Sequence, residues 1–218
     1  MKNDRPYDLA VVGVGNLLWA DEGFGVRCVE DFHRRFEPPP RTRVLDGGTL
    51  GLWLLDCFTT TRDLLLFDCA DLGAPPGTLK VLEREDFSLW SSTRLSPHQA
   101  GVNDVLTAAV LLGRLPERIA VVGAQPLVLD DYGGSLSAPL QALIAPAVEA
   151  AERVLARWGH PLRRRSPNEP IAALTAAGLE KTRYEAERPS IREACREGDV
   201  RFAVQVFKEK SSCASRCP

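Results

Sequence analysis

The chain has 218 residues, of which 44% are hydrophobic and 26% are charged, proportions that argue against wholesale disorder, and no apolar run approaches the roughly 18 residues of a membrane-spanning helix. Its net charge of −2 is unevenly spread, because residues 1–159 contain 15 Lys+Arg and 21 Asp+Glu whereas residues 160–218 contain 12 and 8. An acidic body at −6 and a basic tail at +4 lack the basic stripe of a nucleic-acid-binding protein.

The N-terminal segment predicts a strand, a helix and a second strand. Residues Tyr7–Val14 form a near-continuous apolar run, which is typical of a buried parallel strand. Hydrophobic residues then recur at helical spacing from Asp21 to Phe36, and three consecutive prolines end that segment. We expect the second strand at Thr42–Leu45, followed by the loop Asp46-Gly47-Gly48-Thr49.

The alternation of strands and helices continues to residue 158. In chain order we expect a helix at Leu50–Phe58, a strand at Asp63–Asp68, a hairpin or edge strand at Thr78–Leu82, a helix at Pro97–Leu112, a strand at Arg118–Ala124 and a helix at Leu136–Trp158. This pattern predicts an α/β fold, a three-layer sandwich in which a five-stranded, mixed but mostly parallel sheet carries helices on both faces.

The character of the sequence changes near residue 160. Arg163 to Pro167 has the composition of a linker, and the residues after it form short polar segments interrupted by proline and glycine. We therefore expect a body at residues 1–160 and a polar, partly disordered C-terminal extension at residues 161–218. The extension is expected to be a solvated cationic tail, with docking on an acidic partner or folding back over the body as the alternative.

The six cysteines are spread along the chain without a tight framework, and Cys28, Cys57 and Cys69 lie within apolar periodic segments. The residues before Tyr7 contain no apolar signal core with a small-residue cleavage site. Because cytosolic thiols stay reduced and behave as small buried hydrophobic groups, we expect a cytoplasmic protein.

Three polar residues occur where a strand gives way to a helix or loop. Glu22 follows the first strand, Asp68 ends the strand at residues 63–68, and His98 opens the helix that begins at Pro97. Ligands of open α/β sheets bind at the carboxyl ends of the strands, so these three residues are expected to converge on one cleft.

The local chemistry suits a metal ion. Ser96-Pro97-His98-Gln99 has the form of a capping box, which places His98 in the first turn of a helix, where the dipole favours the neutral imidazole that ligates metals. Asp21 is expected to cap its own helix, with Glu22 kept ionised in the first turn. Asp68 follows four apolar residues and requires a cation or strong donors if it is buried.

Each of these residues also has a purely structural explanation, as a helix-dipole carboxylate, a turn former or a capping histidine. Taken together, one imidazole and two carboxylates suit a divalent transition ion such as nickel or zinc, with coordination positions left open for a substrate. Glu22, Asp68 and His98 are therefore the candidate metal ligands.

Dinucleotide binding is the rival interpretation. Gly13-Val14-Gly15 follows a strand and precedes a helix, and Asp46 lies where a ribose-binding carboxylate is expected. However, Leu18 replaces the third glycine of that fingerprint, and Asp21 and Glu22 would repel a pyrophosphate. The sequence therefore disfavours a dinucleotide site.

The order of these motifs resembles the nickel–iron hydrogenase maturation endopeptidases. The similarity lies in Gly13-Val14-Gly15-Asn16-Leu17-Leu18, in Asp21 to Arg27, in Asp46-Gly47-Gly48-Thr49, in Phe67-Asp68-Cys69 and in Ser96-Pro97-His98-Gln99. It covers the body from about residue 7 to residue 158. Arg183-Tyr184-Glu185, Arg188-Pro189-Ser190 and residues 193–199 resemble the extension of the branch that serves uptake hydrogenases, whereas Cys213 and Cys217 match no pattern.

The resemblance implies an endopeptidase, with residues 1–160 as the peptidase domain, that removes the C-terminal peptide of a hydrogenase large-subunit precursor after nickel insertion. Glu22, Asp68 and His98 would bind the nickel that the precursor brings, and no nucleic acid or membrane insertion is implied. Asp46, together with Glu22 and Asp68, would take part in hydrolysis, and Gly47, Gly48 and Thr49 would contact the substrate. The alternative is a nickel-binding chaperone or delivery protein that uses the same ligands without cleavage.

Overall fold

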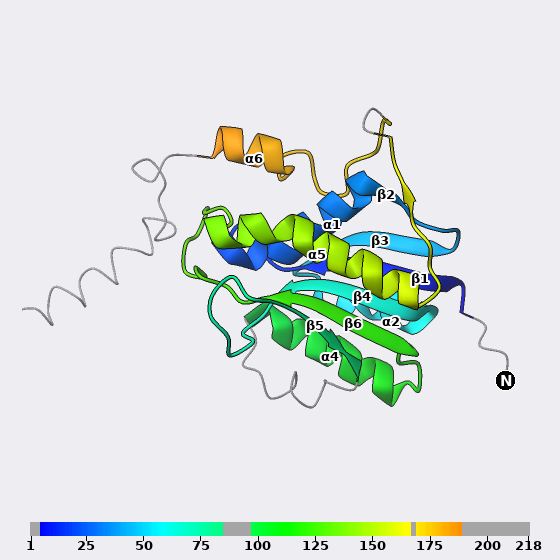
Figure 1. The fold of residues 1–218 in the computed structure, drawn as a ribbon. Coiled ribbons are helices and arrows are strands. Elements are labelled where there is room, and N and C mark those ends of the chain that lie inside the picture. The colour runs from blue at the N-terminus through cyan, green and yellow to red at the C-terminus, as the bar shows by residue number, and fades with distance from the viewer. Residues whose placement is uncertain (1–4, 85–96, 167–168, 189–218) are drawn as a thin grey trace, which may run out of the picture.

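Four parallel strands and one antiparallel edge strand form the central sheet, in the order β3-β1-β4-β6-β5 (Figure 1). The computed structural model describes residues 5–84, 97–166 and 169–188. The strands of this sheet are β1 (Tyr7–Val14), β3 (Thr42–Gly48), β4 (Thr61–Cys69), β5 (Leu79–Glu83) and β6 (Arg118–Ala124). A second, two-stranded sheet pairs β2 (Phe36–Glu37) with β7 (Arg163–Arg164).

Helices cover both faces of the central sheet. One face carries α1 (Phe24–Arg35) and α5 (Ala138–Arg157), and the other carries α2 (Leu55–Thr60) and α4 (Pro97–Leu111). The 3₁₀ turns η1 (Ala20–Gly23) and η2 (Gly51–Leu54) precede α1 and α2, and α6 (Lys181–Glu187) lies outside these layers (Figure 1). The predicted three-layer α/β sandwich is confirmed.

The continuous apolar run of β1 arises because the strand is buried on both faces. Side chains alternate along a strand, so Leu9 and Val11 pack on the α1 and α5 side, whereas Ala10 and Val12 pack on the α2 and α4 side. All four are completely buried. Such burial is typical of a central parallel strand and places β1 in the middle of the fold.

Several predicted boundaries differ from the structure by a few residues, and three of these differences have a clear structural cause. The helix expected from Asp21 starts as the turn η1, and its α-helical part begins only at Phe24. The second strand continues past Leu45 to Gly48, because Gly48 pairs with Val14 across a bulge in the β1–β3 register. The predicted linker is wrong at its first two residues, which form β7 instead.

A buried ionic cluster closes the amino-terminal edge of the sheet. Asp63, in β4, is completely buried; Arg118 Nε donates a hydrogen bond of 2.8 Å to Asp63 Oδ1, and His160 Nε2 lies 2.7 Å from Asp63 Oδ2. Burial alone would raise the pKa of Asp63, but the hydrogen bonds from Arg118 and His160 lower that pKa below its ordinary value. The cluster ties the end of α5 to the strands β4 and β6.

Among the described residues, no helix is both long enough and apolar enough to cross a membrane. Cys28, Cys57 and Cys69 are buried and form no disulfide. Burial raises the pKa of the Cys57 thiol to about 11. These thiols are therefore small core side chains and are poorly suited to act as nucleophiles.

Candidate functional site

The strand order gives the sheet a topological switch point between β1 and β4, and we call the region at the carboxyl-terminal edge of this strand pair the crevice. The chain leaves β1 for β3 on one side, whereas it leaves β4 for β5 and β6 on the other side. In open α/β sheets, ligands bind where neighbouring strands connect in opposite directions. The candidate site therefore lies between the ends of β1 and β4.

The turn η1 follows β1 and packs against β4. Ala20 opens this turn with a φ of 41°, a left-handed conformation that is uncommon for a residue with a side chain. Asp21 is completely buried and Glu22 is buried at 6% exposure. The turn η1 accordingly directs the carboxylates of Asp21 and Glu22 into the protein at the edge of the crevice.

Asp21 does not cap its own helix, in contrast to the prediction, because neither η1 nor α1 has a side-chain cap. Its carboxylate instead accepts backbone hydrogen bonds from Leu127 (2.9 Å), Val128 (2.8 Å) and Ser137 (2.6 Å), and a fourth from the Ser137 hydroxyl (2.9 Å). Four donors stabilise a buried carboxylate. Asp21 therefore fixes the loop after β6 against the turn that carries Glu22.

Asp68 lies at the end of β4, where it is 3% exposed and accepts a hydrogen bond of 2.8 Å from the Cys69 backbone N–H. The pKa of the neighbouring Cys69 thiol is raised well above its ordinary value, by burial first and then by the negative charges of Asp68, Asp21 and Glu22. Carboxylates from β4 and from η1 thus act on the same buried thiol. The structure brings Glu22 and Asp68, two of the predicted ligands, to one end of the β1–β4 pair.

Asp46 lies within β3, opposite Gly13 of β1, and not in a loop as predicted. Its Oδ1 atom accepts a hydrogen bond of 2.9 Å from the backbone N–H of Gly48, a residue whose φ is +40°. Burial raises the pKa of Asp46 above its ordinary value, although the Gly48 N–H and Arg27 lower it. A half-buried carboxylate at a strand end, with its pKa moved toward neutrality, is chemically suited to proton transfer.

The other residues of the predicted glycine loop have separate environments. Gly47 is buried against β1, where a Cβ atom would lie 2.7 Å from Val12 Cγ1, so close packing accounts for this glycine. Thr49 is exposed at the end of the strand. Their expected role in substrate binding stays a prediction.

His98 belongs to the first turn of α4, but its side chain lies outside the described residues, as do Ser96 and its predicted cap. Because α4 ends at Leu111, shortly before β6 begins at Arg118, its first turn lies toward the carboxyl ends of the strands. In the part of the chain that the structure describes, no group of three or more His, Cys, Asp or Glu side chains could hold a metal ion. The three-residue ligand set therefore stays a prediction.

The glycine motif after β1 serves packing between backbone segments. A Cβ atom at Gly15, whose φ is +132°, would lie 1.8 Å from the Glu22 carbonyl oxygen. A Cβ atom at Gly25 would lie 2.2 Å from the Phe67 carbonyl oxygen and 2.3 Å from that of Val14. These close approaches explain why glycines follow β1, and they remove the main support for a dinucleotide site.

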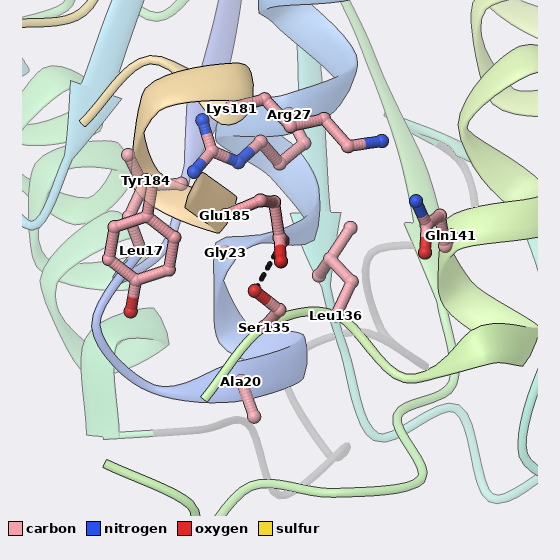
Figure 2. Close-up of a pocket in the computed structure, with 10 residues that line it drawn as sticks. All are labelled: Leu17, Ala20, Gly23, Arg27, Ser135, Leu136, Gln141, Lys181, Tyr184 and Glu185. Atoms are coloured by element: carbon pink, nitrogen blue, oxygen red, sulfur yellow. Dashed lines mark hydrogen bonds between the residues drawn. The ribbon is translucent and has the colours of Figure 1, made fainter. Parts of the chain in front are cut away.

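The helix α6 of the C-terminal extension lies against the body beside η1 (Figure 2). The Arg27 guanidinium, 5% exposed, donates hydrogen bonds to Glu30 Oε2 (2.9 Å) and to the Leu179 carbonyl (2.7 Å), and it lies 5.7 Å from the centre of the Tyr184 ring. Thr175 donates a hydrogen bond of 2.6 Å to Glu30. The extension therefore folds back over the body at least as far as α6.

Figure 2 also shows the hydrogen bond from Ser135 to Glu185, which joins α6 to the loop after β6. The hollow between these elements has a volume of only ≈ 10 Å³, and none of Glu22, Asp46 and Asp68 lines it. A space of this size admits at most about one water molecule. It is an interface between body and extension and not a substrate pocket.

Sequence reasoning missed the roles of Asp21 and Arg27. Both belong to the motif Asp21-Glu22-Gly23-Phe24-Gly25-Val26-Arg27, but their partners lie about 100 or more residues further along the chain. The available signal was the helical spacing of Arg27 with the apolar residues Phe24 and Cys28, because a charged residue at a core-facing position needs a specific partner.

Comparison with known proteins supplies independent information. The family model described as "Hydrogenase maturation protease" matches residues 26–154. The chain is 44% identical to the hydrogenase expression/formation protein HoxM of Cupriavidus necator over 199 residues, which cover 90% of this chain and 98% of HoxM. It is 36% identical to the Escherichia coli hydrogenase 2 maturation protease over 152 residues, which cover 69% of this chain and 92% of that protein.

Solved structures agree with these matches. The hydrogenase maturating endopeptidase HybD from Escherichia coli superimposes with a TM-score of 0.68 and 34% sequence identity, covering 72% of this chain and 98% of HybD. The structure therefore has the same fold as an endopeptidase of similar sequence, and the part of this chain without a counterpart in HybD is of the size of the C-terminal extension.

Proposed function

The chain belongs to the hydrogenase maturation protease family, and from this membership we propose that it removes the C-terminal peptide of a nickel–iron hydrogenase large-subunit precursor once nickel has been inserted. Family membership makes the protein an endopeptidase that processes a hydrogenase large subunit. The dependence on nickel is our proposal. The observation that carries it is the gathering of Glu22 and Asp68 at the crevice between β1 and β4.

In this proposal Glu22, Asp68 and His98 contact the nickel that arrives with the precursor. Two carboxylates and an imidazole are ligands that a divalent transition ion accepts, and three ligands leave positions for groups of the precursor. An unloaded precursor lacks the cation, so it gains nothing from the negative charge at the crevice. Recognition of the metal would thus restrict cleavage to precursor in which insertion is complete.

Asp46 is the proposed general base. Water attacks the carbonyl carbon of the scissile peptide, Asp46 accepts a proton from that water, and Asp46 then returns this proton to the leaving amine as the C–N bond breaks. The raised pKa of Asp46 brings its basicity closer to the pH at which the protein works. The nickel ion of the substrate can polarise the carbonyl oxygen during the attack.

The extension supports a narrower assignment, to the precursor of an uptake hydrogenase. HoxM matches 90% of this chain, which includes most of the extension, whereas the Escherichia coli hydrogenase 2 maturation protease matches only 69%. We also place the protein in the cytoplasm, because its described cysteines are buried free thiols.

The decisive experiment incubates the purified protein with nickel-loaded and nickel-free precursor and follows the precursor by intact mass. We expect loss of a C-terminal peptide from the loaded form only. Equal cleavage of both forms would remove nickel from the recognition step. Binding of the loaded precursor without any change in its mass would favour a nickel-binding chaperone.

A further inference from the structure

Two groups of exposed apolar side chains lie on segments that follow strand ends near the candidate site. The first consists of Leu50, Leu52 and Trp53, in and just before η2, and we call it the η2 ridge. The second consists of Leu127, Leu129 and Tyr132, in the loop after β6, and we call it the β6 ridge. Trp53 is 86% exposed, which is unusual for a large apolar side chain.

Both ridges are held firmly to the site. The Leu50 N–H donates a hydrogen bond of 3.0 Å to the Gly47 carbonyl, only one residue from Asp46. The Leu127 N–H donates a hydrogen bond of 2.9 Å to Asp21, the residue before Glu22. The ridges are therefore fixed extensions of the segments that carry the proposed catalytic and metal-binding carboxylates.

The β6 ridge is also attached to the residues just before η1. Gly133 N–H donates a hydrogen bond of 2.7 Å to the Leu18 carbonyl, and the rings of Trp19 and Tyr132 meet edge to face at 5.3 Å. A loop with this many attachments presents its leucines in a fixed place, which reduces the entropy lost when a partner binds.

We propose that the two ridges bind an extended segment of the precursor on either side of its scissile bond, an inference that rests on the proposed function. The η2 ridge follows the end of β3, whereas the β6 ridge follows the end of β6 and is hydrogen-bonded to η1. The bound segment therefore carries large apolar side chains on both sides of the scissile bond.

The charge between the ridges favours this occupant over a second copy of the chain. Asp21, Glu22 and Asp68 are all buried at the ends of β1 and β4, with exposed fractions of 0%, 6% and 3%, so negative charge gathers in the crevice. A nickel-bearing segment supplies the complementary cation, whereas a second copy would bring its own carboxylates and would close the site.

The test compares three single variants of the full chain. Trp53→Ala and Leu127→Ser remove one side chain from each ridge. Leu111→Ser is the matched control, because Leu111 is 83% exposed but lies at the end of α4, away from the crevice. Since all three side chains are exposed, each variant should melt at nearly the temperature of the wild type, and melting is measured first.

Binding of immobilised protein to nickel-loaded precursor and the kinetics of processing are then measured. We expect the Kd and the KM to rise at least about tenfold for Trp53→Ala and for Leu127→Ser, with kcat nearly unchanged and with Leu111→Ser like the wild type. Polar replacement of the apolar residues that flank the scissile bond in the precursor should raise KM similarly.

The outcomes separate the two proposals. Wild-type affinity in both ridge variants, or an equal loss in Leu111→Ser, would overturn the docking surface while leaving peptidase activity intact. Dissociation of a wild-type dimer by Trp53→Ala, without any effect on precursor binding, would also overturn it. If the precursor binds through Trp53 but is never shortened, the docking surface stands and the peptidase mechanism fails.

Discussion

His160 Nε2 lies 2.7 Å from Asp63 Oδ2, and both side chains are buried at the edge of the sheet opposite the candidate site. His160 directly follows the last turn of α5, whereas Asp63 belongs to the central strand β4. The contact therefore joins the end of the last long helix to the middle of the sheet, and it makes the stability of the fold sensitive to pH.

We predict that Asp63→Asn lowers the free energy of unfolding by about 1–3 kcal/mol near pH 6 and that the loss shrinks in acid. The pKa of Asp63 is lowered in the folded protein. The stabilisation is therefore present above the unfolded-state pKa of about 3.9 and disappears as the pH falls through the folded-state value.

Urea unfolding of both proteins between pH 3 and pH 6 measures this difference. Asp104→Asn is the control, because Asp104 is exposed on α4, and it should leave the curves superimposed. A difference between Asp63→Asn and the wild type that stayed constant down to pH 3 would contradict the prediction.

The proposed nickel contacts predict that Glu22→Ala, Asp68→Ala and His98→Ala each abolish processing of loaded precursor while leaving the fold intact. Replacing a buried carboxylate by alanine removes the cost of keeping that charge away from water, so thermal melting should change little for the two acidic residues. Intact-mass assays report processing, and circular dichroism reports the fold. Asp71→Asn, an exposed change just beyond β4, is the control; full activity in folded His98→Ala would remove that residue from the ligand set.

Asp46→Asn is expected to slow cleavage by about 10²–10⁴-fold, the usual contribution of a general base. Because burial raises the pKa of Asp46, the wild-type rate should fall in acid at a pH above the ordinary value of about 3.9 for an aspartate. The experiment follows kcat/KM against pH for both proteins. An unchanged acid limb in Asp46→Asn would assign the proton transfer to another group.

A chain that ends at Arg165 should fold but melt at a lower temperature. The body keeps its sheet and most of its core, but Arg27 and Glu30 lose their contacts with Leu179 and Thr175, and Leu174 no longer packs against the core. A loss of about 1–3 kcal/mol corresponds to roughly 2–10 °C for a chain of this size. Calorimetry measures the change, and aggregation of the shortened protein would show that the extension covers essential core surface.

Gly25→Ala should destabilise the protein by about 3 kcal/mol or more. The new methyl group would meet the carbonyl oxygens of Phe67 and Val14, which are backbone atoms of two central strands and cannot move aside. Gly178→Ala is the matched control, since a Cβ atom there has no neighbour within 4 Å. Similar chemical denaturation curves for the two variants would mean that α1 shifts to make room.

The sheet could be predicted from the sequence because its central strands are buried on both faces and therefore appear as uninterrupted apolar runs, as in Tyr7–Val14 and Arg118–Ala124. The end of β3 could not, because Asp46-Gly47-Gly48 has a low strand propensity that the pairing with β1 overrides. The convergence of Glu22 and Asp68 followed from the rule for strand ends.

The contacts of Asp21 and the fold-back of the extension were beyond sequence reasoning. Asp21 is adjacent to a helix start, which suggested a cap, but its partners are backbone groups of a distant loop that has no periodic pattern. Arg27 likewise donates a hydrogen bond to the Leu179 carbonyl. Every residue has a backbone carbonyl, so the sequence cannot indicate which one accepts this hydrogen bond. Periodicity reports burial on a regular element and gives no information about such pairings.

The hydrogen bonds of Asp21 also bear on how the protein emerges from the ribosome. Asp21 is synthesised early, but its last partner is Ser137, which appears 116 residues later. The turn that carries Glu22 consequently cannot form all of its hydrogen bonds through Asp21 until nearly two-thirds of the chain has been made. The hydrogen bond from Arg27 to the Leu179 carbonyl forms later still. Domains fold as units during synthesis, so no nascent fragment that ends before residue 137 is expected to recognise or cleave a precursor.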